Sequence, residues 1–352
     1  MHLLRWVLYA LIMVSACLSP IETSAPPPPP PAPPPSYPSY VAIQAGSTYA
    51  VSVTMAHHPS NWSPVPDSIA RLELDTTRSA LNVTGLKTGF ARWNPGIPDY
   101  HPVWIAVLGN PRSAPTLIAH HGLPTDAPEN TLAGVRMACG LSIPGIEVDV
   151  RFTADSVPVL IHDRAVDRTS NGAGNVDEIT LAQLKQLDFG SWFDAKYSGE
   201  AIPTLRDFLA VSGACGIDLI QLDLKGFLPL GVDSGLGRVA QEVKRANLLP
   251  RVQFGSSFIS ELRRVSALIP GARTVLYAGT VTRSIADGAV QNQVDAVSVA
   301  FAAYNTSSAQ LARLDSLGIT IGVWGQFEVL DLNDLVPAPA LVTSDWRWRL
   351  LW

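Results

Sequence analysis

Two apolar stretches of the sequence carry acidic side chains at spacings that suit metal binding. One contains Glu147 and Asp149, and a later one ends in Asp223, two residues before Lys225. Side chains two residues apart in a strand lie on one face, and a charged group in an apolar run needs a partner or a metal. We therefore expect Glu147, Asp149 and Asp223 to form an all-oxygen site, of the kind that Ca²⁺ or Mg²⁺ occupies rather than zinc.

Two histidines are candidates for proton transfer beside that site. His120 ends a third apolar run, and His162 lies in the segment VRFTADSVPVLIHD (150–163), which has the pattern of two extended arms around a turn at 154–156. Such a hairpin leaves the end of a strand and returns to it, so it would bring His162 to the level of the acidic pair. Imidazoles titrate near neutral pH and serve as acid or base. The sequence thus predicts two histidines around one metal ion.

The elements that must position these residues follow a regular pattern from residue 115 onward. Short apolar, β-rich runs alternate with amphipathic, helix-like segments. We expect strands at 116–120, 145–149, 217–223, 251–255, 273–277, 294–299, 319–324 and 340–344. We expect helices at 131–139, 205–213, 236–246, 258–268 and 307–317. Eight such units favour a closed parallel (β/α)8 or TIM barrel, in the α/β class, over an open doubly wound sheet, and they place the site at the carboxyl ends of the strands.

The first forty residues have the composition of an export signal followed by a linker. In residues 1–25, Arg5 precedes an apolar core too short to span a bilayer, which predicts a signal peptide and an exported protein, whether periplasmic, secreted or an outer-membrane lipoprotein. Cys17 ends the sequence VSAC, which resembles a lipoprotein motif whose cysteine is lipidated and attached to a membrane. An ordinary signal peptide with a chance cysteine is the alternative. The proline-rich residues 26–40 predict a stiff, extended spacer.

Between this linker and the barrel, residues 41–110 predict a small β-rich accessory domain. Runs at 49–55 and 69–75 alternate apolar and polar residues, and clusters of proline, glycine and asparagine separate them. Its tryptophans would form either its own core, which we favour, or a carbohydrate-binding platform: Trp62, Trp93 and Trp104. We place the barrel domain at 111–352.

The composition of the chain argues against one class of partner, nucleic acid. The chain has 30 acidic and 25 basic residues, a net charge of −5, and no dense cluster of lysine or arginine, which argues against nucleic acid. The hydrophobic fraction of 47% allows a large core without disulfides.

Cys139 and Cys215 each fall near the end of a helix-like segment, and we expect these segments not to be neighbours. Two buried free thiols are therefore expected rather than a disulfide.

An ordered set of short motifs resembles the glycerophosphodiester phosphodiesterase family. The matching pieces are IAHHG (118–122), PENT (128–131), IEVDV (146–150), VPVLIHDRAVDRTS (157–170), IPTL (202–205), LDLKG (222–226), VW (323–324) and TSD (343–345). The resemblance implies a TIM barrel like that of phosphatidylinositol-specific phospholipase C. It also implies a metal-dependent hydrolase that converts glycerophosphodiesters to an alcohol and sn-glycerol 3-phosphate.

The resemblance also implies a role for each candidate residue. Glu147, Asp149 and Asp223 would bind the divalent cation, and His120 and His162 would be the general acid and base. The substrate-binding residues would be Lys225, as a phosphate ligand, Trp324, beside the alcohol portion, and His121. Within PENT, Glu129 and Asn130 are expected to cap the first helix or orient the site. Arg168 is expected to pair with acidic residues near the hairpin.

Two positions depart from the family's pattern. His121 stands where the family has an arginine, and it lacks that residue's permanent charge and two-pronged grip on phosphate. Asp223 stands where the third metal ligand is usually glutamate. These two differences predict weaker binding of substrate or metal. The alternative to an active enzyme is a catalytically weakened surface-binding protein on the same barrel. Lysophospholipid or a glycerol-phosphate polymer is the alternative substrate.

Overall fold

The structure is a computed structural model that describes the barrel and parts of the preceding β-rich region. The described residues are 40–46, 48–52, 70–75, 80–87, 89–93, 103–108, 115–141, 143–325, 332, 334–345 and 349–351. The predicted signal segment, its Cys17, residues 26–39 of the proline-rich linker and Trp62 lie outside these residues, whereas Tyr40, the last residue of the predicted linker, begins β1. Within the described part of the chain, no helix has the length and apolar character needed to cross a bilayer.

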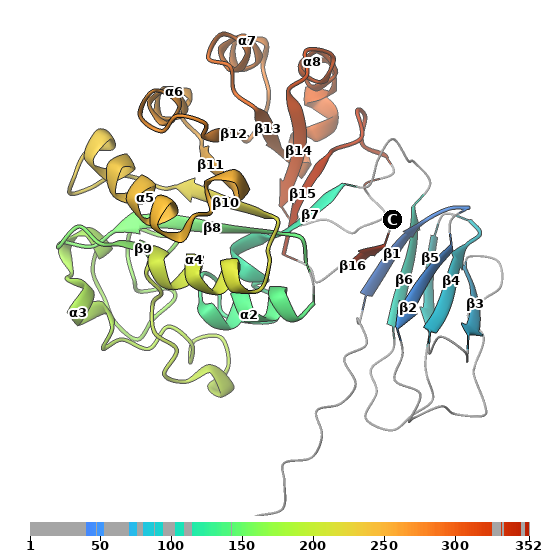
Figure 1. The fold of residues 1–352 in the computed structure, drawn as a ribbon, viewed down its shortest axis with the longest axis horizontal. Helices are drawn as coiled ribbons and strands as arrows, with labels where there is room; N and C mark the ends of the chain where they lie inside the picture. Colours follow the sequence, from blue (N-terminus) through green and yellow to red (C-terminus); the bar gives the residue numbers. More distant parts are fainter. Residues whose placement is uncertain are drawn as a thin grey trace, which may run out of the picture. The chain divides into compact units, whose positions relative to one another are not determined.

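Eight parallel strands close into a barrel (Figure 1). Each strand pairs in parallel with the next, and β8 pairs with both β7 and β10, which closes the ring. The prediction of a TIM barrel rather than an open sheet is confirmed. The strands are β7 (Thr116–Ala119), β8 (Gly145–Phe152), β10 (Leu219–Leu224), β11 (Val252–Ser256), β12 (Arg273–Ala278), β13 (Ala296–Ala300), β14 (Thr320–Gly325) and β15 (Leu341–Ser344).

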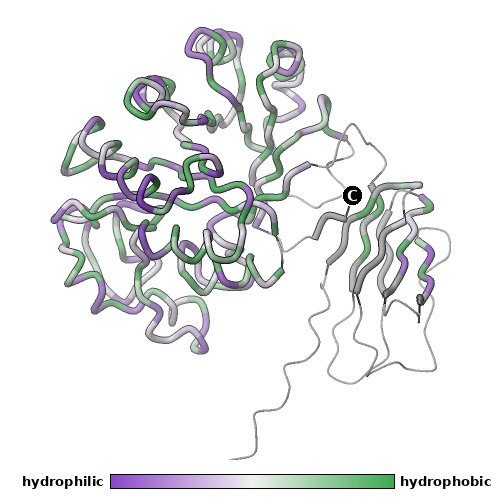
Figure 2. The backbone as a smooth tube through the Cα atoms, viewed as in Figure 1, coloured by the Kyte–Doolittle hydropathy of each residue, from purple (hydrophilic) through white to green (hydrophobic). Residues whose placement is uncertain are grey.

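Helices connect the strands around the outside of the barrel, and Figure 2 shows that they carry both hydrophobic and hydrophilic residues. They are α2 (Leu132–Gly140), α4 (Leu205–Ala214), α5 (Val232–Ala246), α6 (Ile259–Leu268), α7 (Arg283–Gln291) and α8 (Tyr304–Ser316). All but α7 match the predicted helical segments. The fully buried residues of α7 are Ala286 and Ala289, so its buried face lacks the large apolar side chains that mark the other helices.

Strand β8 shows how the barrel separates its polar site from its core. Ile146 and Val148 are buried in the hydrophobic layer between strands and helices, together with Phe208 of α4. Glu147 and Asp149 alternate with them and therefore lie on the inner face of the strand. The alternation of apolar and acidic residues in IEVDV thus sets the direction of both carboxylates.

A long insertion follows β8 before the next barrel helix. It contains β9 (Pro158–Leu160), η3 (Val176–Glu178), α3 (Leu181–Leu184) and η4 (Ala195–Tyr197). The end of β8 pairs antiparallel with β9, so the predicted hairpin is present. The insertion also has a hydrophobic cluster of its own, which includes Ile161, Val176 and Phe189. Since the backbone N–H of Ile161 donates to the Asp149 carbonyl at 3.1 Å, the hairpin returns His162 to the level of the acidic residues.

The described residues before the barrel form two small sheets, one of which also includes residues 349–351 at the end of the chain. One has the order β16-β1-β6-β5, and the other has the order β2-β4-β3. Their strands are β1 (Tyr40–Gln44), β2 (Thr48–Ser52), β3 (Ala70–Asp75), β4 (Ala80–Gly85), β5 (Gly89–Trp93), β6 (Val103–Leu108) and β16 (Arg349–Leu351). Strand β3 lies within the alternating run 69–75, β2 overlaps the run 49–55, and Trp93 and Trp104 lie on β5 and β6. The last strand, β16, pairs in parallel with β1.

The expectation of two free thiols is wrong, because Cys139 and Cys215 form a disulfide, with Cα atoms 5.8 Å apart. Cys139 lies in α2 and Cys215 is the C-terminal cap residue of α4. These helices precede and follow β8 and are consecutive in the outer layer of the barrel. The insertion after β8 separates them in sequence but leaves them adjacent in space.

Removal of this disulfide is expected to destabilise the barrel. The two cysteines are 76 residues apart in sequence, so the bond restricts a long loop of the unfolded chain. Replacing both with serine should lower the free energy of unfolding by about 2–4 kcal/mol. Urea denaturation would measure the free energy of unfolding of the double variant and of the oxidised wild-type chain. The reduced wild-type chain is the control. Equal midpoints for the oxidised and reduced chains would contradict the expectation.

Candidate active site

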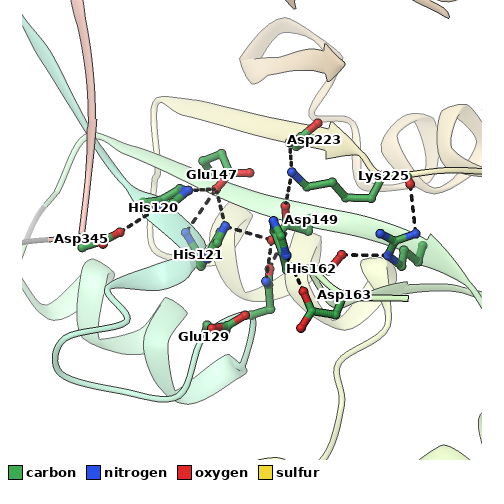
Figure 3. Close-up of polar contacts among 12 residues, drawn as sticks. His120, His121, Glu129, Glu147, Asp149, His162, Asp163, Asp223, Lys225 and Asp345 are labelled. Carbon is green, nitrogen blue, oxygen red and sulfur yellow. Dashed lines mark hydrogen bonds and ion pairs between the residues drawn. The ribbon is translucent and has the colours of Figure 1, made fainter. Parts of the chain in front are cut away.

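Three buried carboxylates meet at the carboxyl ends of two neighbouring strands (Figure 3). Glu147 and Asp149 lie on β8, and Asp223 pairs with Asp149 from β10. Their exposed fractions are 2%, 0% and 6%, and an oxygen of each lies within 4.8 Å of an oxygen of the others. The structure therefore brings together all three predicted metal ligands.

The charge balance of this cluster fits a divalent cation. Lys225 is the ammonium group beside it, with Nζ 3.3 Å from Asp149 Oδ1 and 2.5 Å from Asp223 Oδ2. Asp149 Oδ1 is buried and accepts no hydrogen bond from the described residues. Burial, together with the charge of Asp149, raises the pKa of Glu147 to about 8, so this carboxyl binds a proton readily. A divalent cation would replace that proton and offset the remaining negative charge.

His120 lies in the short turn η2 (His120–Gly122), directly after β7. This turn packs so closely on α2 that a Cβ atom on Gly134 would overlap the carbonyl oxygen of Gly122. The imidazole Nδ1 lies 2.6 Å from Asp345 Oδ1, and Nε2 lies 3.9 Å from Glu147 Oε2. Burial opposes a charge on His120, but the Asp345 hydrogen bond and the Glu147 charge outweigh it and raise the pKa of the imidazole to about 9.

His162 is held in a similar way from the other side of the site. Its Nδ1 lies 2.7 Å from Asp163 Oδ1. Arg168 donates from Nε to Asp163 at 2.6 Å and from both Nη atoms to Glu129 at 2.7 Å each. The hydrogen bond from Arg168 lowers the pKa of Asp163 to about 2. Arg168 therefore pairs with acidic residues near the hairpin, as predicted, and the chain of contacts fixes Nδ1 of His162 and leaves Nε2 for chemistry.

His121 lies between these two histidines. Its ring centroid is 3.7 Å from that of His120 and 5.4 Å from that of His162. Burial lowers the pKa of His121 to about 3, so the ring is neutral at physiological pH. His121 therefore cannot supply the positive charge that an arginine at this position would offer to a phosphate.

The residues of PENT orient the site, but Glu129 and Asn130 do not cap the following helix. Asn130 donates to Asp149 Oδ2 at 2.7 Å and accepts from the Asp149 backbone N–H at 3.0 Å. Thr131 caps α2 instead, since its side chain accepts from the backbone N–H of Gly134. The orienting role expected for Glu129 and Asn130 is confirmed, and their capping role is wrong.

Trp324 lies on β14, opposite Thr343 of β15 in the barrel ladder. It packs against the apolar residues inside the barrel, and its Nε1 is buried without a hydrogen-bond partner among the described residues. The side chain thus presents a large apolar surface with one unused donor, which suits a wall of a binding site.

Several residues of the site were not singled out in the sequence. Asp345 and Asp163 lay inside the TSD and VPVLIHDRAVDRTS motifs but had no visible partners. Arg151 donates to the carbonyl oxygens of His162 at 2.8 Å and Lys225 at 3.0 Å, and so joins the hairpin to β10. Arg151 lies two residues after Asp149 and therefore on the same face of the strand, and this spacing could have identified it from the sequence.

Comparison with known proteins agrees with this geometry. The sequence pattern of the glycerophosphoryl diester phosphodiesterase family matches residues 120–328, which is more than half of the chain. The chain belongs to this family. The matched range contains His120, Glu147, Asp149, His162 and Asp223.

Similar proteins within the family come from bacteria and animals. A glycerophosphodiester phosphodiesterase of Caldanaerobacter subterraneus subsp. tengcongensis is 37% identical over 156 residues, which are 44% of this chain and 63% of that protein. Human glycerophosphodiester phosphodiesterase 1 is 42% identical over 102 residues, 28% of this chain and 31% of that protein. The chain thus spans less than two thirds of the length of these relatives.

Solved structures show the same barrel. A phosphodiesterase of Oleispira antarctica, solved in complex with the product sn-glycerol-3-phosphate, has a TM-score of 0.61 and 26% identity, covering 66% of this chain and 93% of that one. A glycerophosphodiester phosphodiesterase of Agrobacterium tumefaciens has a TM-score of 0.56 and 22% identity, covering 66% and 97%. At 22% identity, the likeness to the Agrobacterium tumefaciens structure shows the fold alone.

Replacing Asp345 with asparagine is expected to move one limb of the pH–rate profile to lower pH. Asp345 raises the pKa of His120 above its ordinary value of 6.5, both through its hydrogen bond and through its charge, so its removal lowers that pKa. The pH dependence of kcat/KM for D345N against wild type reports the change. A shift of the alkaline limb would identify His120 as the acid, and a shift of the acidic limb as the base. An unchanged profile would exclude His120 from proton transfer.

Proposed function

We propose that the chain is a divalent-cation-dependent hydrolase that converts glycerophosphodiesters to an alcohol and sn-glycerol 3-phosphate. The observation that carries the proposal is the pair of histidines whose Nδ1 atoms are held by Asp345 and Asp163 on either side of one buried carboxylate cluster. Membership of the family and the product complex of the Oleispira antarctica neighbour support the substrate class.

The cation would be held by Glu147, Asp149 and Asp223, where it would neutralise the phosphodiester and polarise its phosphorus. Three carboxylates by themselves favour Ca²⁺ or Mg²⁺. Lys225 would bind a non-bridging phosphate oxygen from its half-buried position between Asp149 and Asp223.

His120 and His162 would move the protons. One imidazole accepts the proton of the attacking group, which is a water or a hydroxyl of the substrate, as its oxygen bonds to phosphorus, and the other protonates the alcohol oxygen as its bond to phosphorus breaks. Where a substrate hydroxyl attacks, a water then opens the cyclic phosphate, so both routes consume one water and yield sn-glycerol 3-phosphate. The carboxylates on both Nδ1 atoms fix the ring orientations, so each Nε2 is the atom available for transfer. Trp324 would line the wall beside the alcohol portion, where its apolar ring excludes water.

An oxidising compartment suits the observed disulfide, and we propose that the chain is exported, as its first 25 residues predict. Attachment to a membrane through Cys17 stays a prediction of the sequence.

Hydrolysis of glycerophosphocholine by the full chain tests the proposed function. The reaction is run after chelation by EDTA and again after addition of excess Mg²⁺ or Ca²⁺, and glycerol 3-phosphate is measured with a coupled dehydrogenase. Release of glycerol 3-phosphate only with added cation is the expected result. A folded chain that releases none with any cation would overturn the proposal and favour a binding protein on the same barrel.

A further inference from the structure

One imidazole at the centre of the site has no part in the proposed proton transfers. His121 has 12% of its side chain exposed, and its Nε2 lies 3.1 Å from Asp149 Oδ2 and 3.8 Å from Glu147 Oε2. Both partners belong to the carboxylate cluster proposed to hold the cation. His121 also belongs to two further groups of potential ligand atoms, one with His120 and Glu147 and one with Asp149 and His162.

These distances match the spacing of ligands around a small cation. Zinc bonds to nitrogen and oxygen are about 2.1 Å long, so neighbouring ligand atoms in a tetrahedral site lie about 3.4 Å apart. The separations of His121 Nε2 from the two carboxylate oxygens fall on either side of that spacing. An ion could therefore contact His121 Nε2 together with either carboxylate oxygen, and contact with both oxygens at once would require a movement of the carboxylate side chains.

The backbone holds the ring in this position. His121 has a φ of 46°, in the left-handed region, and its N–H donates to Glu147 Oε2 at 3.2 Å. Its carbonyl oxygen accepts from the backbone N–H of Asn130 at 2.8 Å. A non-glycine residue in this conformation is uncommon and needs such support. These contacts join the turn to Glu147 directly and to Asp149 through Asn130. They therefore hold His121 beside the acidic cluster.

We infer that His121 is a nitrogen ligand of the catalytic cation, which makes the site a mixed nitrogen and oxygen site that prefers Zn²⁺ over Mg²⁺ or Ca²⁺. The inference rests on the cation site of the proposed function and specifies its metal class. Imidazole favours zinc and its neighbours in the first transition row, whereas carboxylates alone favour the alkaline-earth ions. Arginine, the family's residue at this position, has no acceptor atom and cannot bind a cation.

The test measures metal binding directly rather than turnover. The full chain is stripped with EDTA, dialysed, and titrated separately with Zn²⁺, Mn²⁺ and Mg²⁺ in competition with a metal-binding dye. His121→Asn removes the imidazole and keeps a residue that tolerates positive φ, and His121→Arg introduces the family's residue. His162→Asn is the matched control, because it also removes an imidazole near Asp149.

We expect wild type and H162N to bind Zn²⁺ at least about 100-fold more tightly than Mg²⁺, and we expect this ratio to fall by about 10–100-fold in H121N and H121R. A change in the charge of the site alters the affinities for Zn²⁺ and Mg²⁺ alike, so the ratio of the two affinities removes that common effect. The Mn²⁺-loaded wild type should also show hyperfine coupling to a directly bound nitrogen in spin-echo spectroscopy, and H121N should lose it.

Each other outcome overturns a distinct claim. An unchanged ratio, with the nitrogen coupling retained in H121N, would overturn the role of His121 and leave the carboxylate site and the proposed function intact. Loss of the coupling in H162N alone would assign the ligand to His162 instead. A folded wild type that binds none of the three ions would overturn the cation site itself, and with it the proposed function.

Discussion

Replacing His162 with asparagine is expected to lower kcat for glycerophosphocholine by about 10²–10⁴-fold, the usual contribution of a general acid or base. His162 is the imidazole that the hairpin returns to Asp149, and asparagine cannot transfer a proton near neutral pH. The side chain is 41% exposed, so the substitution should leave the fold unchanged. Steady-state rates with saturating cation, together with thermal unfolding of the same samples, measure both effects.

The control for this prediction is Asp163→Asn. It keeps the imidazole and removes only the carboxylate that holds Nδ1. We expect D163N to retain measurable turnover, well above that of H162N. If H162N kept more than a small fraction of wild-type kcat, the acid–base role of His162 would be excluded.

The second large effect is expected for Asp149→Asn, which should reduce both cation affinity and turnover by at least about 10²-fold. Asp149 is fully buried and is the carboxylate shared by the contacts of His121, Lys225 and Asn130. Asparagine keeps its shape but loses the charge that a divalent cation requires. Dye competition would measure affinity, and circular dichroism would establish that the fold is retained.

Asp163→Asn is again the matched control, because it neutralises a carboxylate beside the site but outside the buried cluster. Its cation affinity should stay within a few-fold of wild type. Equal cation affinity in D149N and wild type would show that the ion binds elsewhere.

The barrel and the metal cluster were predictable because they depend on local pattern. Each strand is a short apolar run, and the alternation in IEVDV alone determines that Glu147 and Asp149 share a face. The return of His162 followed from the turn in the segment after β8, since a hairpin of fixed length brings its end back to a known level.

The contacts that hold the histidines were not predictable, because their partners are distant in sequence. Asp345 lies 225 residues after His120, and only the closure of β15 onto β7 brings them together. The disulfide was missed for a related reason, since the insertion after β8 hides the fact that α2 and α4 are consecutive barrel helices. The N-cap of α2 was predictable but was missed, since threonine is a preferred N-cap residue and glutamate is not, and Thr131 directly precedes the helix.

The position of the disulfide has a consequence for how the site responds to reductant and protease. The covalent loop from Cys139 to Cys215 encloses Glu147, Asp149 and His162, together with the insertion that supports His162. A single cut by a protease in the exposed part of that insertion would leave both fragments joined through sulfur. Under oxidising conditions the nicked chain would therefore keep its catalytic groups in one molecule, and under reducing conditions it would lose the covalent link between them.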